Sequence, residues 1–161
     1  MAELIDGVDF ALAAFREVGE WQVRELAHDL IADVDTLVNA LRRFPGEGGA
    51  VGFVAMDEDF FLIIRVSGSQ TRLLLSDITA ADEWELASSA VSFLGLPPPE
   101  DEDDQVPAGD LDLLGDLGMS AIDMGALLDD FDLYPDEMLS DIARKSGFGE
   151  AFDDAVGLTS A

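Results

Sequence analysis

Residues 50–75 read AVGFVAMDEDFFLIIRVSGSQTRLLL. This stretch contains three apolar segments separated by two short polar ones. In Ala50–Met56, Val51, Phe53 and Ala55 fall on one side of a predicted strand, and in the last segment Thr71, Leu73 and Leu75 do so with Arg72 between. Phe60–Val66 is nearly all apolar, which predicts a central strand covered on both faces. Because the intervening segments 57–59 and 67–69 are short, neighbouring strands must run antiparallel. The stretch therefore predicts an antiparallel meander.

Two further strands are predicted before this meander. Along Val8–Phe15, Phe10, Leu12 and Ala14 fall on one face of a predicted strand, and a turn is expected at Gly19 and Glu20. Trp21 and Val23 then alternate with polar residues. Two alternating segments joined by a short turn predict a β-hairpin.

Two amphipathic helices complete the first part of the chain. Asp33 or Asp35 can cap the first, and the second is predicted over 81–94, ending at Gly95. Apolar residues recur at helical spacing in both, at Val34, Leu37, Val38 and Leu41 and at Trp84, Ala87, Val91 and Leu94. The order ββαβββα predicts an α+β fold with an antiparallel sheet of about five strands and helices on one face.

The composition changes at residues 96–109. Pro97–Pro99 favours a stiff extended chain, and five acidic residues follow at 100–104. Such a segment has too little apolar surface to form a core. It predicts an acidic, proline-flanked linker between an α+β domain at 1–95 and a small helical domain at 110–161.

The C-terminal segment predicts a small helical bundle. Helices are expected over Asp110–Leu117, after a cap at Ser120, from Pro135 onwards and over Phe148–Val156. Two of them have apolar faces, made of Met124, Leu127, Leu128 and Phe131 and of Met138, Leu139, Ile142 and Ala143. Because so small a bundle is marginal alone, we expect it to dock on the first domain or on a partner.

Charge is the strongest compositional signal. The chain has 35 acidic and 8 basic residues, a net charge of −27. Such a field repels phosphate backbones and anionic lipid surfaces, so neither direct nucleic-acid binding nor membrane binding is expected. It attracts basic proteins and speeds their association. An alternative reading is that the charge serves solubility alone.

The acidic residues are concentrated towards the C-terminus. Residues 1–95 hold 17 acidic and 6 basic residues, a net of −11, whereas residues 96–161 hold 18 and 2, a net of −16. The shorter part carries more of the charge, so we predict that it makes the electrostatic contact. The candidate partner-contact residues are Glu100, Asp101, Glu102, Asp103, Asp104, Asp129, Asp130 and Asp132.

The residue inventory argues against catalysis, and no cofactor or metal is predicted. There is no cysteine and His28 is the sole histidine, which excludes disulfides, thiol catalysis and zinc held by Cys or by paired His. Phosphate-binding glycine loops and a nucleophile elbow are absent from the sequence. A calcium loop starting at Asp130 would need glycine where Pro135 stands.

The N-terminus and the hydropathy pattern bear on location. Met1-Ala2-Glu3 opens the chain without a basic segment, and no apolar run approaches the ~18 residues of a membrane span. We therefore expect a cytoplasmic protein.

Asp116-Leu117-Gly118-Met119-Ser120 resembles the modification region of acyl carrier proteins, which are also acidic helical bundles. In that family the modified serine follows an aspartate and precedes a leucine. Here Met119 precedes Ser120 and Ala121 follows it. We therefore interpret Ser120 as a helix cap, and a carrier role remains an alternative.

Several motifs, in order and spacing, resemble the tRNA adenosine deaminase-associated proteins of actinobacteria over nearly the whole chain. They are Phe10–Arg16 with Trp21, Leu75–Asp77, the acidic linker, Gly115–Gly118, and Glu137–Leu139 continuing through Arg144–Gly149. That family is named for genes beside a tRNA adenosine deaminase gene.

The resemblance implies a functional link to a tRNA adenosine deaminase. The chain is not itself a deaminase, because it lacks cysteine and the His-x-Glu signature. The favoured reading is a non-enzymatic acidic interaction protein, an accessory or regulatory partner of the deaminase. The alternatives are a carrier-type or small-molecule-binding protein, and a nucleic-acid mimic that competes for a basic surface.

Overall fold

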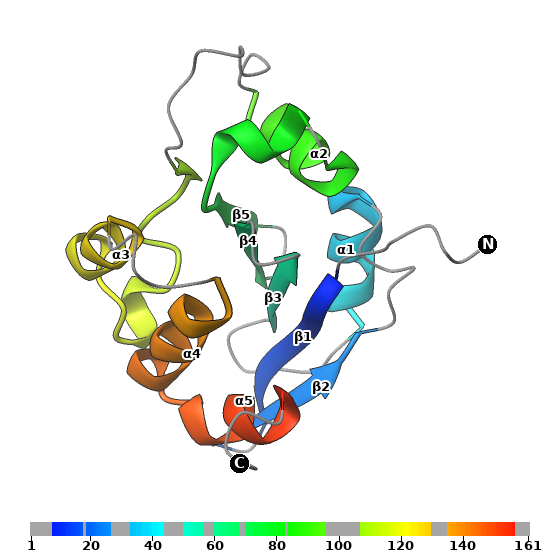
Figure 1. Cartoon of the computed structure of the whole chain (residues 1–161). Coiled ribbons are helices and arrows are strands. Elements are labelled where there is room, and N and C mark those ends of the chain that lie inside the picture. The colour runs from blue at the N-terminus through cyan, green and yellow to red at the C-terminus, as the bar shows by residue number, and fades with distance from the viewer. Residues whose placement is uncertain are drawn as a thin grey trace.

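A six-stranded antiparallel sheet forms the centre of the computed structural model (Figure 1). The structure describes residues 8–17, 19–26, 33–43, 50–56, 60–67, 70–82, 84–95, 107–129 and 135–156. The strands are β1 Val8–Glu17, β2 Glu20–Glu25, β3 Ala50–Met56, β4 Phe60–Ser67, β5 Gln70–Leu75 and β6 Ala108–Gly109. Their order across the sheet is β2-β1-β3-β4-β5-β6.

The predicted meander is confirmed as β3, β4 and β5. Phe53 pairs with Ile63, and Ile63 pairs in turn with Leu74. Every residue of β4 except Ser67 is buried, as a central strand covered on both faces should be. The hairpin of β1 and β2 is also confirmed, with Phe15 opposite Gln22.

One face of the sheet is covered by α1, Val34–Leu41, and α2, Glu85–Phe93 (Figure 1). Of the two predicted caps of α1, Asp33 is the one used, since its Oδ1 accepts a hydrogen bond from the Thr36 N–H at 2.8 Å. The second helix begins later than predicted. Asp77 Oδ1 accepts from the Thr79 N–H, which starts a short 3₁₀ helix, η3 Ile78–Asp82, and Trp84 is extended before α2.

The opposite face is covered by the C-terminal helices α3, Ala121–Leu128, α4, Pro135–Ser146, and α5, Gly149–Val156 (Figure 1). Phe53 of β3 packs against both Phe148 and Phe152, with ring centroids 5.4 and 5.7 Å apart. The buried face predicted for α4 is confirmed, since Met138, Leu139, Ile142 and Ala143 are all buried in this second core.

The α+β class and the antiparallel sheet are confirmed, with two differences in detail. The sheet has a sixth strand, β6, which lies inside the predicted linker. Helices α1 and α2 share one face as predicted, and the C-terminal helices pack on the other. The helix predicted over Asp110–Leu117 is wrong, because only Gly115–Leu117 forms a 3₁₀ turn, η4. The Asp110 carboxylate accepts from the Asp112 N–H at 2.9 Å, a local turn that competes with helix. The division into 1–95, 96–109 and 110–161 stays a prediction.

Candidate functional site

Most of the predicted contact residues, as well as His28, lie outside the described part of the chain. This holds for Glu100–Asp104, Asp130 and Asp132. Asp129 is described, and its side chain is exposed at the C-terminal end of α3. Its N–H donates to the Gly125 carbonyl at 3.1 Å. The structure therefore places one predicted contact residue on α3.

Helix α3 is short and almost entirely apolar, with the sequence AIDMGALL. Ser120 caps it, because its Oγ accepts from the Asp123 N–H at 3.1 Å, which confirms the interpretation of this serine as a cap. Met124 and Leu128, one turn apart, are buried in the second core. These two side chains fix which side of α3 faces the protein.

The other side of α3 is apolar as well. Ile122 is 84% exposed, and Ala126, one turn later, is also exposed. Gly125 lies between them and is half-buried. We call Ile122, Gly125 and Ala126 the α3 strip.

Carboxylates flank the α3 strip. Asp123 lies in α3 and Asp129 is its C-cap residue, and both side chains are exposed. Leu111 Cδ1 lies 4.0 Å from the position that a Cβ on Gly125 would take, so the segment that follows β6 passes beside α3. The α3 strip is thus an apolar contact area with an acidic rim.

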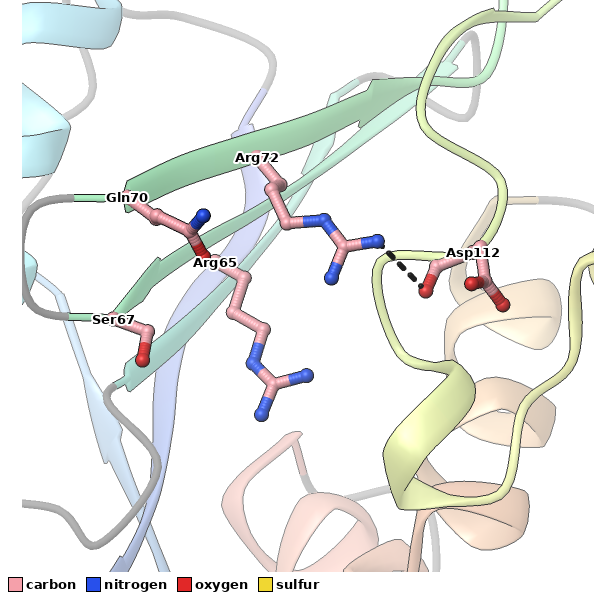
Figure 2. Close-up of a pocket in the computed structure, with 5 residues that line it drawn as sticks. All are labelled: Arg65, Ser67, Gln70, Arg72 and Asp112. Atoms are coloured by element: carbon pink, nitrogen blue, oxygen red, sulfur yellow. Dashed lines mark hydrogen bonds between the residues drawn. The ribbon is translucent and has the colours of Figure 1, made fainter.

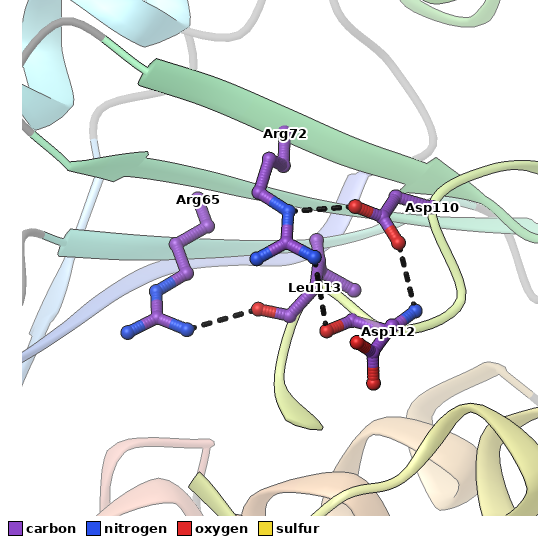
Figure 3. Close-up of polar contacts among 5 residues, drawn as sticks. All are labelled: Arg65, Arg72, Asp110, Asp112 and Leu113. Carbon is purple, nitrogen blue, oxygen red and sulfur yellow. Dashed lines mark hydrogen bonds and ion pairs between the residues drawn. The ribbon is translucent and has the colours of Figure 1, made fainter. Parts of the chain in front are cut away.

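Two arginines lie opposite each other in the register of β4 and β5. Arg65 pairs with Arg72, and both side chains reach the segment that follows β6 (Figure 3). Arg65 is only 8% exposed, and its Nη1 donates to the Leu113 carbonyl at 2.9 Å. Arg72 Nε donates to Asp110 Oδ2 at 2.6 Å, and its Nη2 donates to the Asp112 carbonyl at 3.2 Å.

These contacts hold the pKa of Asp110 below its usual value. Partial burial on its own would raise this pKa, but the hydrogen bonds from Arg72 and the Asp112 N–H and the guanidinium charge outweigh burial. Two like charges directly opposite in a sheet repel each other, and the carboxylate and carbonyls of 110–113 offset that repulsion. The arrangement fastens the 110–113 segment to the sheet.

A polar recess of about 250 Å³ opens beside these arginines (Figure 2). Its lining residues are Arg65, Ser67, Gln70, Arg72 and Asp112. Both guanidiniums already donate to the 110–113 segment, so we assign the recess a structural role. Within the described ranges, no group of three or more His, Cys, Asp or Glu side chains could hold a metal ion. No helix in the same ranges is long and apolar enough to cross a membrane.

Sequence reasoning missed Ile122. The apolar face predicted for this helix contained Leu127, which is only partly buried, and Phe131, which lies outside the described residues. The sequence did contain a signal of an exposed apolar side. Seven of the eight residues in AIDMGALL are apolar or glycine, which is more than a helix with one buried side requires.

Comparison with known proteins identifies the family. The model of the Rv3753c-like tRNA adenosine deaminase-associated proteins matches residues 9–149. The chain belongs to this family. Its sequence is 38% identical over 152 residues to Protein Rv3753c of Mycobacterium tuberculosis, covering 92% of this chain and 87% of that protein. The search of solved structures gave no significant match.

The family match confirms the resemblance drawn from the motifs. It begins in β1 and ends at the first residue of α5, so it includes the sheet, the arginine contacts and α3. The α3 strip therefore lies within the matched residues.

Proposed function

We propose that this chain is a non-enzymatic accessory protein that binds a tRNA adenosine deaminase. The observation that carries the proposal is a net charge of −27 in a family described as associated with such an enzyme. The proposal places the chain in the cytoplasm, together with the enzyme and its tRNA substrate.

The physical basis is charge complementarity. An enzyme that acts on tRNA must bind a polyanion, and proteins do so with lysine and arginine side chains. A protein of net charge −27 is attracted to such a surface for the same reason that tRNA is. Because exposed charges are screened over about 8 Å at physiological ionic strength, the complex should weaken steeply as salt rises.

Competition with tRNA tests which surface of the deaminase is bound. We would immobilise this chain, load the purified deaminase of the same organism, and add increasing tRNA. Displacement by tRNA would place both ligands on the same basic surface, as expected for a nucleic-acid mimic. Retention of the enzyme, with tRNA joining the complex, would indicate an accessory role beside the tRNA site.

A deamination assay then gives the direction of regulation. If this chain binds the same surface of the deaminase as tRNA does, it should raise the apparent KM of the enzyme for tRNA without lowering kcat. A chain that binds beside that surface should leave tRNA binding intact. Failure of the deaminase to bind the immobilised chain at low salt contradicts the proposal as a whole.

A further inference from the structure

We propose that α3 is the docking element of this chain, and that the α3 strip contacts an apolar patch bordered by lysine and arginine on a partner protein. The proposal rests on the proposed function, in which that partner is the deaminase. It adds the surface, the central residue and the chemistry of the opposing surface.

The exposure of Ile122 is not required by the fold. Met124 and Leu128 on the other side of α3 supply its contact with the core, and Ile122 is 84% exposed. A β-branched residue is also a weaker helix former than alanine or glutamate at an exposed position. The isoleucine therefore makes no evident contribution to the monomer.

The neighbours of Ile122 allow close approach. Gly125 and Ala126 lie one turn further along the same side, and neither extends beyond a methyl group. A Cβ added to Gly125 would have one neighbouring atom outside α3 within 4 Å, which is Leu111 Cδ1 at 4.0 Å. The α3 strip is thus a projecting side chain beside a low apolar surface, a shape that accommodates a partner side chain of similar size.

The acidic rim selects the kind of partner. Asp123 and Asp129 are exposed beside the α3 strip, and the whole chain adds a field of the same sign. A second copy of this chain would bring the same carboxylates together and be repelled. Lipid head groups and nucleic acid are disfavoured for the same reason. A basic protein surface with an apolar centre is the occupant that can both cover the α3 strip and pair with the carboxylates beside it.

The test uses Ile122→Glu, a change that separates apolar from electrostatic binding. It makes the chain more acidic by one charge, so purely electrostatic attachment to a basic partner should hold or tighten. Loss of a buried isoleucine contact should instead weaken binding about 10- to 100-fold. Ser88→Glu is the matched control, since it adds the same charge at an exposed position of α2 on the opposite face of the sheet.

Binding of purified deaminase to the wild-type chain and to each variant would be measured by titration at fixed low salt. We expect weaker binding for Ile122→Glu, a smaller loss for the uncharged Ile122→Ala, and wild-type affinity for Ser88→Glu. Circular dichroism and thermal melting verify that each variant is folded. If Ile122→Ala and folded Ile122→Glu bind as the wild type does, the docking role of α3 is overturned while the proposed function stands. If the wild-type chain does not bind at all, the proposed function fails, and this inference with it.

Discussion

Arg72 on β5 donates a hydrogen bond from its Nε to Oδ2 of Asp110, the residue directly after β6, at a distance of 2.6 Å. The same guanidinium reaches the Asp112 carbonyl, and Arg65 opposite it reaches Leu113. The chain that leads from β6 towards α3 is therefore attached to the sheet at three successive points. These contacts fasten the segment that leads into the C-terminal helices, which pack on the second face of the sheet through an apolar core.

Replacing Arg72 with alanine should lower the free energy of unfolding by about 1 kcal/mol. Arg72 and Asp110 side chains are each 37% exposed, so solvent screens their attraction and the ion pair alone contributes about 0.2–1 kcal/mol. Loss of the bond to the Asp112 carbonyl adds to this. Urea denaturation measures the change.

Arg144→Ala is the control for Arg72→Ala. Arg144 also forms an ion pair, with Asp141 one turn before it in α4, but its side chain is 68% exposed. A pair of this kind contributes about 0.3–0.5 kcal/mol. An equal loss for both variants would contradict the role given to Arg72.

The lowered pKa of Asp110 predicts a pH-dependent contribution to stability. Because the folded pKa lies below the unfolded value, near 3.9, the carboxylate stabilises the fold above that value. The contribution is lost as the pH falls through the folded pKa. The stability difference between the wild type and Asp110→Asn should therefore be constant near neutrality and shrink below about pH 4. A difference that does not change from pH 6 to pH 3 would count against it.

Gly109→Ala should be strongly destabilising. Gly109 has φ +119°, and a Cβ there would lie 2.3 Å from the Leu73 carbonyl oxygen, a backbone atom that cannot move aside. Strain and clash together should cost about 2 kcal/mol or more, and should disrupt the pairing of β6 with β5. Thermal denaturation, and amide exchange at Asp110, whose N–H donates to the Leu73 carbonyl at 2.9 Å, would measure both effects.

Gly125→Ala, the same substitution in α3, should have the opposite sign. Gly125 is in the helix interior, and the nearest atom to a new Cβ is Leu111 Cδ1 at 4.0 Å. Alanine is favoured over glycine in a helix by about 1 kcal/mol, so this variant should be more stable by up to that amount. Destabilisation would show that α3 packs against Leu111 too tightly to accept a methyl group at this position.

Ser146→Ala should leave stability unchanged or raise it by about 1 kcal/mol, because it removes a desolvated hydroxyl. Ser146 is 3% exposed at the end of α4, and its Oγ has no hydrogen-bond partner among the residues described. Urea denaturation of the variant measures this, with Ser140→Ala as the control. Ser140 Oγ donates to Asp153 Oδ1 at 3.0 Å, so its loss should destabilise.

Local patterns in the sequence predicted the elements that local interactions determine. The meander follows from alternation and short turns, and the caps at Asp33 and Ser120 follow from side chains that bond to backbone three residues on. The buried side of α4 follows from helical spacing alone.

What the sequence did not predict depends on distant contacts. β6 is two residues long, too short to have a period, and it exists because Leu74 and Leu75 offer an edge to pair with. Arg65 interrupts an apolar strand, and the carbonyl it donates to is 48 residues away. The exposure of Ile122 depends on which side of α3 faces the second core, and periodicity in so apolar a helix does not decide that.

The most direct test of the account is capture of the purified tRNA adenosine deaminase by this chain at about 50 and about 500 mM salt, a range over which the screening length falls severalfold. We predict capture at the lower concentration and loss at the higher one, because the attraction lies between exposed carboxylates and a basic surface. Absence of capture at both concentrations would contradict a physical complex with the deaminase.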